Sequence, residues 1–335
     1  MAKGLFQERN GGLVMKGEKI LITGGAGFIG SNFVRKMLKK QPDSQIIVLD
    51  ALTYAGNKNN LKDLIDKITF VHGDIRNRKD VEKSIKGCSK IVHFAAETHV
   101  DRSISDPTPF LSTNILGTGV LLDMARKHNI EKFLHISTDE VYGSIKNKNG
   151  KFTEEDIFRP NNPYSVSKAS GDLLVRAFHK TYDLPVVIVR PSNNYGPYQH
   201  PEKLIPLFIT NLLKGKKVPL YGDGSNVRDW LFVEDCCEAI LTVLYKGKTG
   251  EAYNISGECE KINLEVTKII LKLLSKFEDM IEFVEDRKGH DFRYALSNDK
   301  IRKIGWSPKI LFDKGIRKTV DWYKKNSWWW KPLIG

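Results

Sequence analysis

Short apolar segments alternate with amphipathic segments along the first half of this 335-residue chain. The segments typical of buried strands are residues 19–23, 45–49, 69–72, 90–94, 132–137 and 186–189. Apolar residues at helical spacing between them predict helices over 28–40, 80–85, 110–128 and 164–182. Strands that alternate with helices form parallel sheets with helices on both faces. The sequence therefore predicts an α/β fold built on a doubly wound parallel sheet.

The pattern changes after Arg190. Residues 191–335 mix turn signals, such as those at 195–197 and 221–224, with further helical stretches. We expect a smaller, mixed α/β substrate-binding domain there, next to a cofactor-binding domain at 18–190, and segments of the two can interleave. Residues 1–17 are polar and rich in glycine, which predicts a disordered extension or a tag.

Composition narrows the class of protein. The chain is 41% hydrophobic, enough for a large core, and it contains no run of 18 apolar residues, so we expect no membrane span. Its four cysteines show no metal-ligand spacing, which favours reduced thiols in the cytoplasm and predicts no metal site. The formal net charge is +13, but the basic residues are scattered among acidic ones. We therefore expect no nucleic-acid partner.

Three glycines, Gly24, Gly27 and Gly30, lie between the first predicted strand and the first predicted helix. Glycine at such a turn lets the backbone approach a pyrophosphate at the helix N-terminus, as in Rossmann folds. Asp50 comes at the end of the next predicted strand, where a carboxylate accepts hydrogen bonds from ribose hydroxyls and repels a 2′-phosphate. The spacing therefore predicts a dinucleotide site and favours NAD over NADP.

Two pairs of residues carry the predicted chemistry. Tyr164 and Lys168 are four apart in a predicted helix, hence on one face. A lysine ammonium beside a phenol, with a positive nicotinamide ring nearby, favours the phenolate and lowers its pKa, so that it can take a proton from a substrate hydroxyl. Asp139 and Glu140 follow the fifth predicted strand, at the edge of the sheet that faces ligands. Adjacent carboxyl groups can divide acid and base work if their environments separate their pKa values.

Several strings of residues, spread from about residue 19 to 330, carry a resemblance. They are GGAGFIGSN from Gly24, DALTYAGN from Asp50, AAETHVDRS from Ala95, STDEVYG from Ser137, PYSVSK from Pro163, SNNYGPY from Ser192 and RDW from Arg228. Together they resemble the dTDP-glucose 4,6-dehydratases, within the extended short-chain dehydrogenase/reductase family of NAD-dependent epimerases and dehydratases. Relatives that epimerise C4 generally lack the acidic pair of the STDEVYG string.

The resemblance implies a lyase that removes water from dTDP-glucose and gives the 4-keto-6-deoxy sugar. It implies that Tyr164 takes the O4 proton while C4 passes a hydride to NAD, and that Glu140 removes the C5 proton. Asp139 would protonate the departing C6 hydroxyl, after which the hydride returns to C6, C5 is reprotonated and NAD is regenerated. Thr138 would hydrogen-bond near O4, and Lys168 would also orient the nicotinamide ribose.

The resemblance also implies two sets of binding residues. Those expected at the cofactor are Gly24, Gly27, Phe28, Ile29, Gly30, Asp50, Thr53, Asp74, Ile75, Phe94, Ala95, Ala96, Thr98, Thr113, Tyr164 and Lys168. Those expected at the substrate are Thr98, Asn193, Asn194, Lys203, Leu204, Pro219, Tyr221, Arg228, Asn263, Arg287 and His290. Arg228 can fork onto phosphate oxygens and Tyr221 can stack on the nucleobase. Lys288 stands where the family usually has proline.

Other functions stay open at this point. A UDP-glucose, CDP-glucose or GDP-mannose 4,6-dehydratase, or a nucleotide-sugar 4-epimerase, is the alternative within the enzymes. Thymine and uracil differ by one methyl group, which is worth ~1 kcal/mol in an apolar pocket, so no single residue decides between these two bases. A nucleotide-binding sensor without catalysis is a further alternative, which the four catalytic side chains disfavour. The resemblance also implies a homodimer, in which the predicted helices 110–128 and 164–182 pack as a four-helix bundle.

Overall fold

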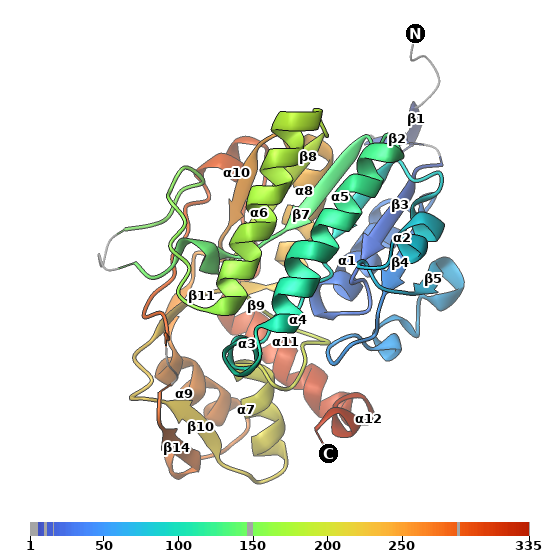
Figure 1. Ribbon diagram of the computed structural model, residues 1–335. Helices are drawn as coiled ribbons and strands as arrows, with labels where there is room; N and C mark the ends of the chain where they lie inside the picture. Colours follow the sequence, from blue (N-terminus) through green and yellow to red (C-terminus); the bar gives the residue numbers. More distant parts are fainter. Residues whose placement is uncertain (1–5, 10–11, 16, 146–149, 287–288, 335) are drawn as a thin grey trace.

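A seven-stranded parallel sheet lies at the centre of the computed structural model, which describes residues 6–9, 12–15, 17–145, 150–286 and 289–334 (Figure 1). The strand order is β12-β8-β7-β6-β3-β4-β5. The bounds are β3 Lys19–Thr23, β4 Gln45–Asp50, β5 Thr69–His72, β6 Lys90–His93, β7 Lys132–Ile136, β8 Val186–Pro191 and β12 Ala252–Ile255. The predicted α/β fold with a doubly wound parallel sheet is confirmed.

Side chains that alternate along each strand give the sheet two apolar faces. On β3, Ile20 and Ile22 belong to one buried cluster and Leu21 to another. The first cluster is covered by α1 (Phe28–Lys40) and α8 (Val233–Lys246), the second by α2 (Arg78–Ile85), α5 (Thr118–Lys127) and α6 (Pro163–Tyr182). Figure 1 shows α5 and α6 side by side across one face. Because both faces are buried, the strands are apolar at nearly every position.

The predicted helix over 110–128 has a composite structure. It begins with α4 (Thr108–Phe110), continues as the π-helix η3 (Leu111–Gly117) and ends as α5. The short helix α3 (Val100–Ser105) precedes it. A π-helical turn widens a helix and is often found beside functional sites. Here it carries Thr113 to the cavity described below.

A smaller mixed region lies beyond the carboxyl ends of the large sheet, in the lower part of Figure 1. It has a three-stranded sheet of order β13-β11-β9 and a parallel pair of β10 with β14. The strands are β9 Asn193–Tyr195, β10 Val218–Tyr221, β11 Val227–Phe232, β13 Glu260–Ile262 and β14 Ile281–Val284. The helices are α7 Leu204–Leu213, α9 Asn263–Leu273, α11 Phe312–Lys325 and α12 Ser327–Trp330. These elements share a third apolar cluster.

The second half of the chain does not stay in this smaller region. After β11, helix α8 packs on the large sheet, β12 pairs with β8 at its edge, and α10 (Asp299–Lys303) contacts β12. The division of the chain at residue 190 into a cofactor-binding and a substrate-binding domain therefore stays a proposal. Within residues 1–17 the structure has an antiparallel pair of strands, β1 Phe6–Arg9 and β2 Gly12–Met15. The expectation that residues 1–17 form a disordered extension or a tag stays a prediction.

Several short helical turns also belong to the described part of the chain. The remaining helical turns are η1 Lys58–Leu61, η2 Ile65–Lys67, η4 Asp139–Tyr142, η5 Glu278–Met280 and η6 Lys331–Leu333. Among the described residues, no helix combines the length and the apolar character that crossing a membrane requires.

Candidate active site

A cavity lies at the carboxyl ends of the central strands, between the large sheet and the smaller region. It is lined by all the residues expected at the cofactor and by all those expected in catalysis. Of the residues expected at the substrate, those lining it are Thr98, Asn193, Asn194 and Lys203. Those not lining it are Leu204, Pro219, Tyr221, Arg228, Asn263 and His290, and Arg287 lies outside the described residues. The structure thus brings together the cofactor and catalytic sets and separates part of the substrate set.

The glycine turn forms one wall of this cavity. Gly24 has a φ of +70°, and a Cβ there would come within 2.5 Å of the backbone nitrogen of Ala95. A Cβ on Gly30 would lie 2.3 Å from the carbonyl oxygen of Gly24. At Gly27 a Cβ would meet only that same carbonyl, at 3.3 Å. Two of the glycines therefore let the turn close on its neighbours, and the third leaves room toward the cavity.

Asp50 holds the turn in place. Its carboxylate accepts hydrogen bonds from the backbone nitrogens of Ala26 at 2.9 Å and Leu52 at 2.8 Å. The side chain is buried, and burial raises its pKa despite these two bonds. Asp74, after β5, pairs with Arg76 through Nη2 at 2.6 Å. Burial would raise the pKa of Asp74, but the hydrogen bonds from Arg76 outweigh it and lower the pKa.

Tyr164 and Lys168 enter the cavity from the first turns of α6. Asn162 caps this helix by accepting from the backbone nitrogen of Ser165, which fixes where the helix begins. Tyr164 is 7% exposed and packs edge-on against Phe110. The ammonium of Lys168 donates to the carbonyl oxygen of Ile136 at the end of β7, at 2.6 Å. The two side chains therefore lie on one face of the helix, as expected.

The protein's own side chains do not lower the pKa of Tyr164, and the expected lowering, which includes the charge of a nicotinamide ring, stays a prediction. Burial raises the pKa of Tyr164 well above its usual value, and the nearby charge of Glu140 raises it further. Burial also lowers the pKa of Lys168 to about 8, against an opposing effect of Asp172. The reason is that both groups lie in a dry environment, where desolvation disfavours their charged forms.

Asp139 and Glu140 begin the short helix η4. Thr138 caps η4 by accepting from the backbone nitrogen of Glu140, and it donates to Asp139 at 3.1 Å. Burial raises the pKa of Asp139 well above its usual value, and the charge of Glu140 adds to this effect. Both effects favour the protonated form of Asp139. Glu140 acts on the pKa of both Asp139 and Tyr164, which places the three groups in one electrostatic neighbourhood.

Several buried polar atoms of the cavity wall have no hydrogen-bond partner among the described residues. They are Oγ of Ser137, Oδ2 of Asp139, Oδ1 of Asn193 and Oε1 of Gln199. A buried polar atom that lacks a partner costs about 1–3 kcal/mol. A polar ligand in the cavity would remove this cost. The open side of the glycine turn and these atoms together fit a dinucleotide and a second polar molecule.

Tyr54 and Arg102, which the sequence did not single out, contact residues of the cavity wall. The guanidinium of Arg102 lies 3.9 Å from the ring centre of Tyr54, and it also pairs with Glu202 at 3.3 Å. The hydroxyl of Tyr54 is 3.1 Å from Oγ1 of Thr98, and Lys203 donates to the carbonyl of Thr98 at 2.8 Å. Three segments far apart in sequence meet here, so no local signal could have marked them.

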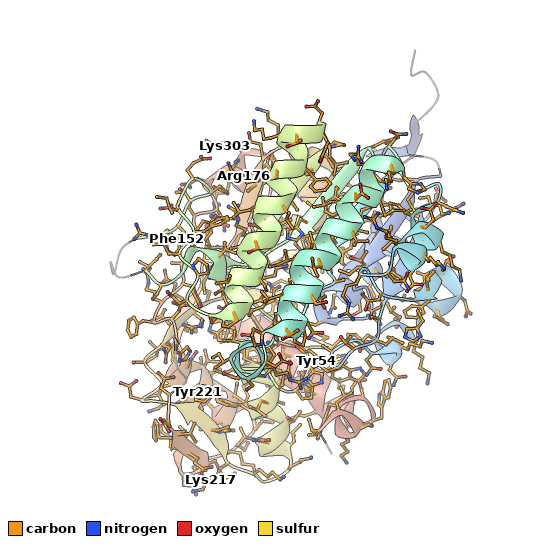
Figure 2. All side chains as sticks on the ribbon, in the orientation of Figure 1. Tyr54, Phe152, Arg176, Lys217, Tyr221 and Lys303 are labelled. Atoms are coloured by element: carbon orange, nitrogen blue, oxygen red, sulfur yellow. The ribbon has the colours of Figure 1, made fainter. Side chains whose placement is uncertain are left out.

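The remaining substrate residues form a second group in the smaller region. Arg228 lies 2.9 Å from Nε2 of His290, whose ring meets that of Tyr221 edge-on at 6.1 Å. Figure 2 shows Tyr221 apart from Tyr54, which contacts Thr98 of the cavity wall. Arg228 also donates to the carbonyls of Val227 and Asp291. Its expected fork onto a phosphate stays a prediction.

Comparisons with known proteins place this site in a family. The family described as GDP-mannose 4,6 dehydratase matches residues 21–319. The low-salt glycan biosynthesis protein Agl12 of Haloferax volcanii is 54% identical over 91% of this chain and 98% of its own. A dTDP-glucose 4,6-dehydratase of Streptomyces niveus is 52% identical over 94% of this chain and 95% of its own.

Solved structures agree with this placement. DesIV, a dTDP-glucose 4,6-dehydratase of Streptomyces venezuelae solved with NAD and dTDP bound, has a TM-score of 0.92 at 51% identity, over 94% of this chain and 99% of its own. A UDP-glucose 4-epimerase of Thermus thermophilus in complex with NAD has a TM-score of 0.86 at 31% identity, over 91% of this chain and 99% of its own.

The fold and the cavity define the class, since the chain is an extended short-chain dehydrogenase/reductase of the NAD-dependent epimerase/dehydratase type. At 52% identity to one of its relatives over nearly the whole length, it belongs to the family of the dTDP-glucose 4,6-dehydratases.

The close contacts of the glycine turn predict the effect of a single methyl group. Gly30→Ala would press its Cβ against the carbonyl of Gly24, which costs about 1–3 kcal/mol in a well-packed site. We expect lower thermal stability and a loss of dinucleotide from the purified protein, measured by absorbance of the released nucleotide. Gly119→Ala on α5 is the matched control, because nothing lies within 4 Å of the added methyl group. Equal dinucleotide content in the two variants would contradict this reading of the turn.

Proposed function

We propose that the protein converts dTDP-glucose to dTDP-4-keto-6-deoxyglucose with loss of water, using NAD. The observation that carries this proposal is the meeting of Tyr164, Lys168, Asp139 and Glu140 in one cavity beside the glycine turn. An oxidation at C4 needs the first pair, and the elimination of water across C5 and C6 needs the second. The acidic pair favours a dehydratase over a 4-epimerase, which needs only the oxidation at C4 and the return of the hydride to the other face of that carbon.

NAD would be held by the turn from Gly24 to Gly30 at its pyrophosphate and by Asp50 at its ribose. When bound, it would supply a hydride acceptor and a positive charge on its nicotinamide ring. The other residues proposed at the cofactor line the same cavity. The remaining steps concern the side chains of the chain itself.

Tyr164 would remove the proton from O4 of the glucose, and Thr138 would hydrogen-bond near the same oxygen. The ketone formed at C4 makes the C5 proton acidic, and Glu140 would remove it. Asp139, whose raised pKa favours the protonated form, would donate its proton to the leaving C6 hydroxyl. Two adjacent carboxyl groups would thus perform opposite tasks, and return of the hydride to C6 with a proton to C5 would complete the 4-keto-6-deoxy product.

The nucleotide would extend from this centre toward the smaller region. Asn193, Asn194 and Lys203 line the cavity and are proposed to contact the sugar diphosphate. A second group of residues is proposed to bind the nucleoside. It consists of Tyr221, Arg228 and His290, with Leu204, Pro219, Arg287 and Asn263. Arg228 is buried with His290, so binding there would exchange its present backbone acceptors for phosphate oxygens.

The substrate assay tests the function directly. The purified protein is incubated with dTDP-glucose and, separately, with UDP-glucose, and the alkali-developed chromophore of the 4-keto-6-deoxy product is followed. We expect a signal with dTDP-glucose and a weaker one with UDP-glucose, because the pocket for one methyl group is worth about 1–3 kcal/mol. A stronger signal with UDP-glucose would favour the sibling enzyme, and no signal with either substrate would reject the proposal.

Glu140→Gln separates the two chemical steps. The variant keeps the shape of the side chain but cannot remove the C5 proton, so turnover should fall roughly 10²–10⁴-fold. Reduction of bound NAD by dTDP-glucose should persist in part, since Tyr164 and Lys168 are intact. The measurements are NADH absorbance and incorporation of solvent deuterium at C5. Deuterium exchange at the full rate would show that another group is the base.

We also propose a homodimer through the helical face of α6 and the segment η3–α5. Large apolar side chains are exposed on these elements, with Leu116 at 66%, Leu173 at 56% and Tyr182 at 49%. Apolar side chains gathered on one helical face commonly mark a protein interface. A cytoplasmic location is a further part of the proposal, supported by four free cysteines.

A charge on the proposed interface tests the dimer. Leu173→Asp places a carboxylate where the partner helix would pack, and burying an unpaired charge is strongly unfavourable. We expect the variant to sediment as a 38.1 kDa monomer while the unmodified chain sediments as a dimer. Phe277→Asp, at a side chain that is 80% exposed elsewhere, is the control and should leave the mass unchanged. A monomeric unmodified chain would end this proposal.

A further inference from the structure

A continuous line of buried polar side chains runs behind the two catalytic pairs. It begins at Asp172, fully buried on α6 one turn beyond Lys168. Asp172 accepts a hydrogen bond from Nε of Arg190 on β8 at 2.8 Å. Nη1 of Arg190 donates in turn to the hydroxyl of Tyr142 at 2.6 Å. Tyr142 ends η4, the short helix that begins with the two catalytic carboxyl groups, so this line joins the two pairs through the protein interior.

Tyr142 is held on several sides. Its hydroxyl donates to Oδ1 of Asn254 at 2.9 Å, on strand β12. Its ring stacks on Phe152 with centroids 4.9 Å apart and an angle of 19°, and it meets Phe158 edge-on. Because these contacts fix one end of η4, they limit how far the catalytic carboxyl groups at its other end can move.

The charges along the line also act on the oxidation pair. Asp172 and Arg190 are almost completely buried, so each depends on the other for compensation. His135 lies 3.5 Å from Asp172, and burial keeps the pKa of His135 well below its usual value, so the imidazole is neutral. The charge of Asp172 opposes the effect of burial on the pKa of Lys168, which is about 8. Asp172 therefore favours the ammonium form of Lys168.

We propose that Asp172, Arg190 and Tyr142 are positioning residues that hold the oxidation pair and the dehydration pair in one register. The inference rests on the proposed function and deepens it. None of the three side chains lines the cavity, so they act through the residues that do. The two pairs must serve neighbouring carbons of one bound sugar, and displacements near 1 Å can cost about 10²-fold in rate. A shared buried anchor would keep both pairs aligned across both steps.

Tyr142→Phe tests this proposal with little risk to folding, because the ring and its stacking contacts remain. In single turnover with dTDP-glucose, we expect the loss of water to slow by about tenfold while the reduction of bound NAD changes by less than about twofold. The first rate is measured by mass spectrometry of quenched product and the second by NADH absorbance. Tyr253→Phe is the matched control. Tyr253 is 3% exposed, and its hydroxyl accepts one hydrogen bond from the backbone nitrogen of Lys248, which precedes β12.

Asp172→Asn gives an independent readout. It keeps an acceptor for Arg190 but removes the charge that favours the ammonium form of Lys168. Loss of that charge lowers the pKa of Lys168 further, so the rate of NAD reduction should begin to fall at lower pH than in the unmodified enzyme. If Asp172 affects only overall stability, the pH at which the rate of NAD reduction begins to fall will be the same in Asp172→Asn and in the unmodified enzyme.

The outcomes separate the inference from the function on which it rests. If the unmodified enzyme turns over dTDP-glucose and Tyr142→Phe matches Tyr253→Phe in both rates, the positioning role is overturned. The same follows if Tyr142→Phe slows both steps equally. Should Asp172→Asn fail to fold, the tyrosine pair decides alone. An unmodified enzyme that reduces no NAD with either nucleotide sugar would overturn the proposed function, and the inference with it.

Discussion

The parallel direction of the central strands is the constraint on which the site depends. Since β3, β4, β6, β7 and β8 run the same way, their carboxyl ends meet at one edge, and every loop that follows them opens there. The glycine turn follows β3, the acidic helix η4 follows β7, and Asn193 follows β8. Apolar side chains on both faces of each strand fix this arrangement, so chemistry at the edge rests on packing in the core.

Burial is the dominant electrostatic effect at the catalytic centre. It raises the pKa of Tyr164 and of Asp139 and lowers that of Lys168, so each group is driven toward its neutral form. A neutral Asp139 suits an acid, whereas a neutral Tyr164 does not suit a base. The protein's own charges leave this imbalance in place. A positive charge bound beside the phenol is therefore an electrostatic requirement of the proposed mechanism, which explains why a cofactor site and a proton-transfer site share one cavity.

The sequence predicted the fold and the centre of the site because both depend on local patterns. Strand and helix periodicity located β3 to β8, and the glycine and Tyr-x-x-x-Lys spacings placed residues that do line one cavity. Strand β12 was missed, since a short segment such as 252–255 gains its place only by pairing with β8. Tyr54, Arg102 and Glu202 were missed for the same reason, because their contacts join distant segments. The direction of the Lys168 ammonium toward Ile136 was equally beyond local reasoning.

The pair of Asp172 and Arg190 shows how the interior serves the edge. A buried ion pair is a weak source of stability, because the desolvation of two charges offsets much of their attraction, and apolar residues of similar volume often do as well. Stability alone therefore does not explain why the guanidinium of Arg190 on β8 lies buried against Asp172 of α6. Apolar packing would fill the same space, but it would not fix the direction of a phenol on η4 or place a negative charge one turn from Lys168. Directional bonds and a defined charge are what aligned proton transfers require, and only polar groups provide them.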